Sequence, residues 1–129
     1  MKFTGREQSW LLIKNKCRRK SGRQKWRFKM GKCKITVLKT LYFEDLAREY
    51  PPYETSPCEL LREGQVFYTG GPMGVDMPEG FCEAAWRSIF SFAAVYASGG
   101  KIYGRYDTHV VACPDGVRPV LLRLEAAEN

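Results

Sequence analysis

The amino-acid sequence predicts an α+β fold, with a small antiparallel or mixed sheet of about four strands packed on one long helix and a short second helix. Three patterns carry this prediction. Residues 34–40 alternate between apolar and polar types, and residues 81–97 place apolar side chains at helical spacing. Two strand-like runs near the C-terminus flank a Pro-Asp-Gly turn.

The first strand and the short helix follow one another directly. Residues 34–40 combine the alternation with β-branched side chains, which is typical of a half-buried strand. Residues 41–50 are expected to form a short helix that places Leu46 and Tyr50 on one face. Pro51 ends this helix, because proline donates no backbone hydrogen bond and disfavours helix in the residue before it.

A second strand is expected at residues 65–69, and a glycine-rich loop follows it at residues 70–76. The glycine spacing matches neither the phosphate-binding loop of nucleotide hydrolases nor the dinucleotide fingerprint. A plain turn-forming loop is therefore favoured over an anion-binding nest.

The long helix has the clearest signals. Asp76 to Glu79 resemble a capping box, so we expect the helix to start there. Trp86, Phe90 and Ala97 widen its apolar stripe, which predicts burial of more than half its circumference, and Gly99 ends it. The stripe itself consists of Phe81, Ala85, Ile89, Phe92, Ala93 and Tyr96.

The last two strands are expected at residues 108–112 and 117–124. Pro114, Asp115 and Gly116 lie between them, and these residue types are typical of a tight hairpin turn. The two strands should therefore pair with each other in an antiparallel hairpin.

Charge divides the chain at residue 30. Residues 1–30 carry eleven Lys or Arg and one acid, whereas residues 31–129 carry ten Lys or Arg and thirteen acids. The net charge of +7 therefore comes from the N-terminal part. We expect residues 1–30 to be a basic extension and residues 31–129 to be a single small α+β domain.

Two interpretations of residues 1–30 stay open. They are either a poorly ordered extension or start-site artefact preceding a natural start at Met30, or an electrostatic arm for nucleic acid or an acidic membrane surface. Binding of nucleic acid is expected only through this extension. The apolar run Trp10 to Ile13 is too short for a secretory signal, and Glu83 and Arg87 interrupt the longest apolar stretch. The expected localisation is therefore cytoplasmic, with no membrane partner.

Short runs of residues distributed over 32–125 form a recognisable combination. Each run is short, but together they are specific: residues 33–39, 44–46, 57–58, 63–65, 77–82, 85–86, 99–100, Cys113, 115–116 and 118–120. With these runs the chain resembles a family of small, uncharacterised, cysteine-containing proteins of anaerobic bacteria and archaea. The resemblance implies a cytoplasmic protein of anaerobic metabolism, and it implies no activity.

Five cysteines are present, and no two of them form a C-x-x-C pair. An odd count in a reducing compartment argues against a disulfide framework. Cys82 is expected in the first turn of the long helix, where unpaired N–H groups favour the thiolate form. If the fold brings the side chains together, the candidate ligands of zinc or an iron–sulfur cluster are Cys58, Cys82, Cys113, Cys33 and His109. Cysteine is also a common core residue, so purely structural cysteines are the alternative.

Other candidate groups are few. His109 is the only histidine, and no nucleophilic triad can be assembled, so no catalytic residue is assigned. Asp107 and His109 would share one face of a strand, where a polar strand edge is favoured over an acid–base pair. Arg118 is a candidate anion-binding residue, and the alternative is that it pairs with Asp115 to fix the hairpin.

Three hypotheses of function follow. The chain is a cysteine-ligated metal or iron–sulfur binding accessory protein, a protein- or nucleic-acid-interaction module with structural cysteines, or a thiol-dependent enzyme that uses Cys82. The first is favoured, because four cysteines and one histidine fall within the single predicted domain.

Overall fold

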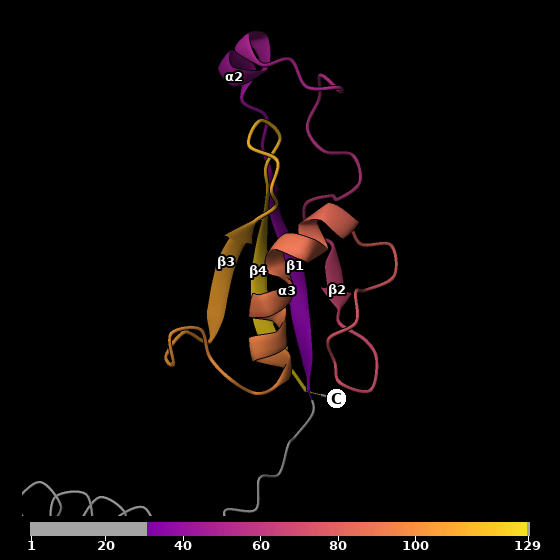
Figure 1. The fold of residues 1–129 in the computed structure, drawn as a ribbon, viewed down its shortest axis with the longest axis vertical. Coiled ribbons are helices and arrows are strands. Elements are labelled where there is room, and N and C mark those ends of the chain that lie inside the picture. Colours follow the sequence, from indigo (N-terminus) through magenta and orange to yellow (C-terminus); the bar gives the residue numbers. More distant parts are fainter. Residues whose placement is uncertain (1–30, 129) are drawn as a thin grey trace, which may run out of the picture.

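The computed structural model describes residues 31–128, so the extension expected at residues 1–30 lies outside them. Within these residues six elements follow one another (Figure 1). They are β1 (Lys32–Thr40), α2 (Glu44–Glu49), β2 (Val66–Tyr68), α3 (Glu83–Ala97), β3 (Thr108–Ala112) and β4 (Val120–Ala127).

The strands form one antiparallel sheet with the order β2-β1-β4-β3. The helix α3 packs against one face of this sheet, as Figure 1 shows, so the predicted α+β fold is confirmed. The long central strands β1 and β4 pair from Lys32 opposite Ala127 to Thr40 opposite Val120. One irregularity interrupts this pairing between Val37 and Lys39.

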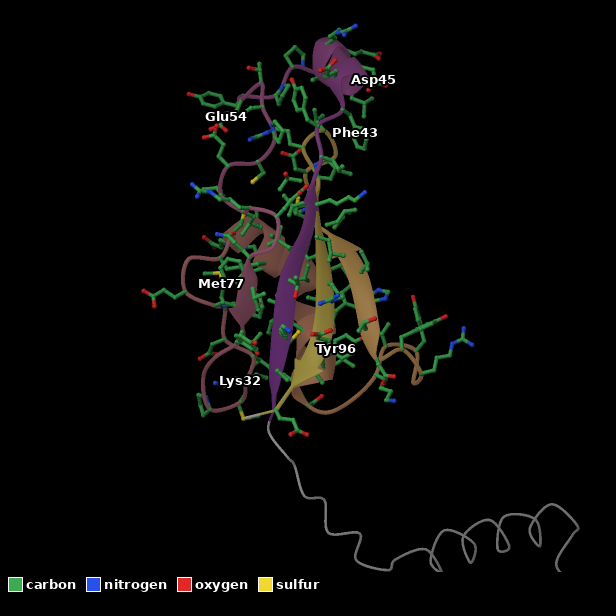
Figure 2. The ribbon with its side chains drawn as sticks, turned by 180° about the vertical axis from the view of Figure 1, so that it is seen from behind. Lys32, Phe43, Asp45, Glu54, Met77 and Tyr96 are labelled. Atoms are coloured by element: carbon green, nitrogen blue, oxygen red, sulfur yellow. The ribbon has the colours of Figure 1, made fainter. Side chains whose placement is uncertain are left out.

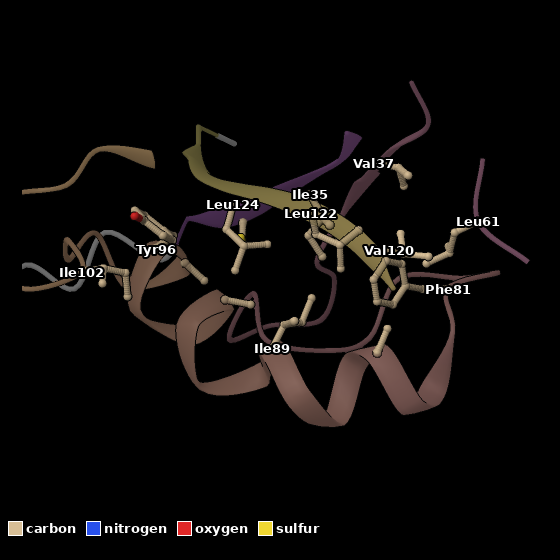
Figure 3. Close-up of a cluster of buried hydrophobic side chains, with 14 residues drawn as sticks. Ile35, Val37, Leu61, Phe81, Ile89, Tyr96, Ile102, Val120, Leu122 and Leu124 are labelled. Atoms are coloured by element: carbon tan, nitrogen blue, oxygen red, sulfur yellow. The ribbon is translucent and has the colours of Figure 1, made fainter. Parts of the chain in front are cut away.

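The hydrophobic core lies between the sheet and α3 (Figure 3). Alternate residues of the central strands point into it, which is the two-residue periodicity that the sequence shows. The fully or almost fully buried side chains include Ile35, Val37, Leu61, Ile89, Tyr96, Val120, Leu122 and Leu124. Phe81, Leu61 and Val120 lie together at the end of the core where α3 begins.

The hairpin between β3 and β4 differs from the prediction. β4 begins at Val120, three residues later than the expected strand at residues 117–124. Residues 117–119 bind instead to the segment that follows β1. The carbonyl of Val117 accepts a hydrogen bond from the N–H of Phe43 at 3.0 Å, and the carbonyl of Pro119 accepts one from the N–H of Leu41 at 2.9 Å. The chain between Cys113 and Val120 is therefore a longer loop that is attached to the end of β1.

The short helix does not bury the face on which Leu46 and Tyr50 were expected to lie together. α2 covers only Glu44–Glu49, and its buried side chain is Ala47. Leu46 is 36% exposed and Tyr50 is 62% exposed. Figure 1 shows the reason: α2 lies beyond the end of the sheet, where no opposing layer covers it.

The predicted start of the long helix was also wrong. The backbone of Asp76 pairs with Gly70 by two hydrogen bonds of 3.0 Å, which closes the glycine-rich loop instead of capping a helix. Gly80 then adopts a positive φ of 74°, a conformation that favours glycine. The helix begins at Glu83, and Cys82 is its N-cap residue.

The burial of α3 confirms the core stripe and corrects its width. Ala85, Ile89, Ala93 and Tyr96 are buried as expected, whereas Phe90 is 45% exposed. Of the three residues expected to widen the stripe, Ala97 is fully buried and Trp86 is partly buried against the core, so Phe90 alone departs from the prediction. Within residues 31–128 the structure contains no helix with the length and apolar character needed to cross a membrane.

The glycine-rich loop is a turn that packs closely on the chain. Gly74 has a φ of 66°, and a Cβ atom there would lie 2.0 Å from the carbonyl oxygen of Gly31. Only glycine tolerates both conditions. Gly74 therefore allows this loop to pack closely against the start of β1.

Candidate functional site

A small pocket lies beside the first turn of α3. Its volume is about 150 Å³, and Cys58, Cys82 and Cys113 all line it. Arg118 and Asp115 from the β3–β4 loop also line the pocket. Three of the five predicted metal ligands and the predicted anion-binding residue therefore share one site.

Cys82 reaches this pocket because it caps α3. Its neighbour Phe81 is buried and packs edge-on against Phe67 of β2, with ring centroids 5.1 Å apart. The Cys82 carbonyl accepts the N–H of Trp86 at 2.9 Å and so starts the helix. The Cys82 side chain itself makes no capping hydrogen bond, and the residue lines the pocket.

Cys113 is fixed by the hairpin. Its N–H donates to the carbonyl of Val120 at 3.0 Å, and its Sγ accepts the N–H of Val120 at 3.3 Å. The loop beyond it is closed by Asp115, whose Oδ1 accepts the N–H groups of Val117 and Arg118 at 3.0 and 2.9 Å. The Cys113 sulfur therefore has a defined position and already accepts a donor.

Cys58 lies on the irregular connection between α2 and β2, and Arg118 holds that connection in place. The guanidinium Nη2 donates to the carbonyl of Pro57 at 3.0 Å and to Oε2 of Glu54 at 3.1 Å, and Nε donates to the carbonyl of Ser56. Figure 2 shows Glu54 on this connection, beside the end of the molecule that carries α2. The residue next in sequence to these acceptors is Cys58.

The other two predicted ligands lie elsewhere. Cys33 is fully buried on β1, where its N–H donates to Oγ1 of Thr69 at 2.8 Å. Burial raises the pKa of its thiol from 9.0 to about 12. His109 on β3 packs against the rings of Phe92 and Tyr103, with centroid separations of 5.3 and 6.4 Å.

The arrangement is not a preformed metal centre. Within residues 31–128, no group of three or more His, Cys, Asp or Glu side chains stands close enough to hold a metal ion. The three pocket cysteines line one space, but they would have to move closer together to share a single ion. Cys33 and His109 do not line that pocket.

Two further sequence hypotheses concern polar pairs. Asp107 forms an ion pair with Lys101 at 2.6 Å, while His109 makes the ring contacts described above. Arg118 contacts Asp115 through its backbone N–H, whereas its guanidinium binds the Cys58 connection. Glu54 could not be identified from the sequence, because an ion pair between residues 64 positions apart leaves no local pattern.

The comparisons with known proteins identify no family for this chain. No family model matches the chain, and no curated protein and no solved structure is significantly similar to it.

Proposed function

We propose that this protein binds a thiolate-ligated metal centre, either a single zinc ion or an iron–sulfur cluster, through Cys58, Cys82 and Cys113. The observation that carries the proposal is that these three cysteines, from three separate segments, line one pocket of about 150 Å³. Thiolates are the preferred protein ligands of zinc and of iron–sulfur clusters.

The segments that carry the three cysteines suit a site whose ligands move closer together when the metal binds. Cys82 and Cys113 belong to a helix cap and a hairpin, both held by backbone hydrogen bonds. Cys58 lies on a connection without regular structure, and the Arg118 contacts reach residues 54, 56 and 57 of it but not Cys58 itself, so a change confined to Cys58 breaks no helix, strand or Arg118 contact. Metal binding and local ordering are commonly coupled in this way, because the bonds to the metal offset the cost of closure.

The sequence resemblance supports a role in anaerobic metabolism. Iron–sulfur clusters and thiolate sites are sensitive to oxygen, and the family that the chain resembles comes from anaerobic bacteria and archaea. Within this proposal the protein is an accessory protein that holds the metal centre, and no reaction is assigned to it.

Metal analysis after anaerobic purification of the full chain tests the proposal. We expect one zinc ion per chain, or iron with acid-labile sulfide in cluster stoichiometry. The two readouts distinguish a single ion from a cluster. Cys58→Ser, Cys82→Ser and Cys113→Ser should each lower the metal content severalfold, because each removes one ligand.

Cys33→Ser is the matched control. Cys33 does not line the pocket, so its replacement should leave the metal content of folded protein unchanged. A metal content that stays the same in all three pocket variants would refute the proposal. The same holds if the purified chain, offered zinc or reconstituted with iron and sulfide, retains none.

A reactive thiol at Cys82 is the second candidate. Cys82 caps a helix of fifteen residues and also lines a neighbouring open hollow together with Glu83 and Arg87. Accessible cysteines in such positions react readily with electrophiles. Alkylation of the metal-free protein tests this candidate, which requires Cys82 to react at least about tenfold faster than Cys58 and Cys113.

A further inference from the structure

The sheet has one face that α3 does not cover. Alternate side chains of β1 and β4 are buried towards α3, so the residues between them point to the opposite side. Figure 2 shows the molecule from that side, with the strands in front of the helix. We call this surface the open face. Its strand residues are Lys32, Lys34, Thr36 and Lys39 of β1, Val66 and Tyr68 of β2, Thr108, Val110 and Ala112 of β3, and Leu121, Arg123, Glu125 and Ala127 of β4.

Charge is distributed unevenly between the open face and the rest of the domain. The strand residues of the open face include four Lys or Arg and one acid, so their net charge is +3. The other residues of 31–128 include six Lys or Arg and twelve acids, which gives a net charge of −6. The excess of acids in the domain as a whole therefore conceals a basic surface, because that surface is assembled only when the strands pair.

Two of the basic side chains share the single carboxylate of this face. Lys34 Nζ lies 3.3 Å from Oε1 of Glu125, and Arg123 Nε lies 3.4 Å from Oε2 of the same residue. The three side chains are 24–39% exposed, so an anion can reach them from solvent. One carboxylate cannot neutralise two cations, and the local excess of positive charge attracts a polyanion.

An exposed aromatic ring lies beside these cations. Tyr68 is 50% exposed and stands directly opposite Lys34 in the pairing of β1 with β2. Side chains at such positions have Cβ atoms about 4.5–5.5 Å apart. A ring and a cation at this spacing suit a nucleotide, because the base can stack on the ring while the phosphate contacts the ammonium group.

The basic N-terminal part of the chain joins the domain at one end of this face. Residues 1–30 carry eleven Lys or Arg and one acid, and they lead through Gly31 to Lys32. The N–H of Gly31 donates to the carbonyl of Ala97 at 2.9 Å, which fixes the point of attachment beside the end of α3. The basic extension and the basic face are therefore adjacent in the chain.

We propose that the open face of the sheet binds single-stranded nucleic acid, with Lys34 and Arg123 contacting phosphates and Tyr68 stacking on a base. A nucleic acid uses both the charge and the exposed ring, whereas an anionic lipid surface would use the charge alone. From the sequence, nucleic acid was expected only at residues 1–30, and the proposal extends that site onto the folded domain. It is independent of the proposed metal site, because no residue of the open face lines the cysteine pocket.

The experiment measures the fluorescence anisotropy of a short, labelled, single-stranded RNA of mixed sequence, titrated with the full-length chain at several salt concentrations. The variants are Glu125→Gln, Tyr68→Ala, Tyr68→Phe, and a chain that combines Lys34→Gln with Arg123→Gln. Arg48→Gln is the charge control, because Arg48 is an exposed arginine on α2, beyond the end of the sheet. Tyr53→Ala is the control for Tyr68→Ala, because Tyr53 is a fully exposed tyrosine on the connection after α2.

We expect the wild type to bind the RNA with an affinity that falls as salt rises. The double cation variant should bind severalfold more weakly and lower the salt slope by about 1–2, since two phosphate contacts are lost. Glu125→Gln should bind more tightly, because it frees Lys34 and Arg123 from their internal anion. Tyr68→Ala should weaken binding at least about fivefold, and Tyr68→Phe should bind as the wild type does.

Three results would overturn the inference. The first is that the wild type does not bind the RNA. The second is that the double cation variant binds as the wild type does, or loses no more per charge than Arg48→Gln, because residues 1–30 or the net charge would then account for binding. The third is a loss in the double cation variant with none in Tyr68→Ala, which would favour an anionic lipid surface and is followed by binding to phosphatidylserine vesicles. If Tyr68→Ala does not fold by circular dichroism, Tyr68→Leu replaces it, because leucine keeps an apolar side chain without the ring.

Discussion

Two kinds of cysteine are distinguished by their surroundings. Cys33 alternates inward with Ile35 on the central strand and has no exposed surface, so it acts as a small core residue. Cys58, Cys82 and Cys113 are half-buried and share a pocket. The same residue type is therefore a fully buried core residue in one place and a half-buried pocket residue, packed against the edge of the core, in the other.

The burial of Cys33 predicts a pH dependence of stability. Because the thiol pKa rises from 9.0 to about 12 on folding, the unfolded chain loses this proton first as the pH rises. The contribution of the protonated thiol is complete below about pH 9 and is lost progressively towards about pH 12. By about pH 10 the wild type should have lost on the order of 1 kcal/mol from this group.

Urea unfolding of the wild type and of Cys33→Ala at about pH 8 and about pH 10 measures this effect. The alanine variant should be less stable at the lower pH, because the substitution leaves a cavity, and it should lose less on going to the higher pH. Equal losses in the two proteins would show that Cys33 ionises as freely in the folded state as in the unfolded chain.

At the scale of elements, the sequence predicted those that depend on local pattern. The alternation in β1 and the stripe along α3 identified the buried residues Ile35, Val37, Ala85 and Ile89. The start of β4 could not be found in this way, since it depends on hydrogen bonds to a segment about 75 residues earlier in the chain. Local sequence patterns do not indicate hydrogen-bond partners that lie so far apart in the chain.

The start of α3 was predicted several residues too early. The Asp76–Glu79 segment has the residue types of a capping box, yet the backbone of Asp76 bonds to Gly70 and closes the preceding loop. The error mattered for the site, because it placed Cys82 inside the first turn of the helix instead of at the cap. Asp76 closes the glycine-rich loop instead of capping a helix. The positive φ of Gly80 is not helical, so the helix begins only after it.

The packing of α3 can be tested by one pair of substitutions. Ile89→Ala should lower the free energy of unfolding by roughly 2–5 kcal/mol, because Ile89 is fully buried against the sheet. Phe90→Ala is the control on the exposed side of the same helix, where the loss should stay at about 1 kcal/mol or less. Chemical denaturation of both variants gives the comparison, and a larger cost at Phe90 would contradict the orientation of the helix.

The β3–β4 loop depends on Asp115. Replacement by alanine removes the acceptor of two backbone N–H groups and should lower the free energy of unfolding by about 1–2 kcal/mol. Asp115→Asn keeps the Oδ1 acceptor and should restore most of this loss. Denaturant unfolding of the two variants tests the loop, and no difference between alanine and asparagine would mean that these hydrogen bonds contribute nothing.

At the scale of the whole molecule, the site depends on tertiary structure. In the sequence 24 residues separate Cys58 from Cys82, and 31 separate Cys82 from Cys113. The sequence could name the cysteines as candidate ligands, but only the antiparallel sheet and the helix across it show that three of them line one pocket. Cys33 lies within β1 and His109 lies within β3, and neither residue lines the pocket of Cys58, Cys82 and Cys113.

The proposed function requires Cys58, Cys82 and Cys113 to bind one metal ion together. A crystal structure of the full chain loaded anaerobically with zinc, with an anomalous map at the zinc edge, tests this most directly. We expect one zinc peak in the pocket, bonded to the Sγ atoms of all three cysteines at about 2.3 Å. A zinc ion bound elsewhere, or one held by fewer than two of these three sulfurs, would contradict it.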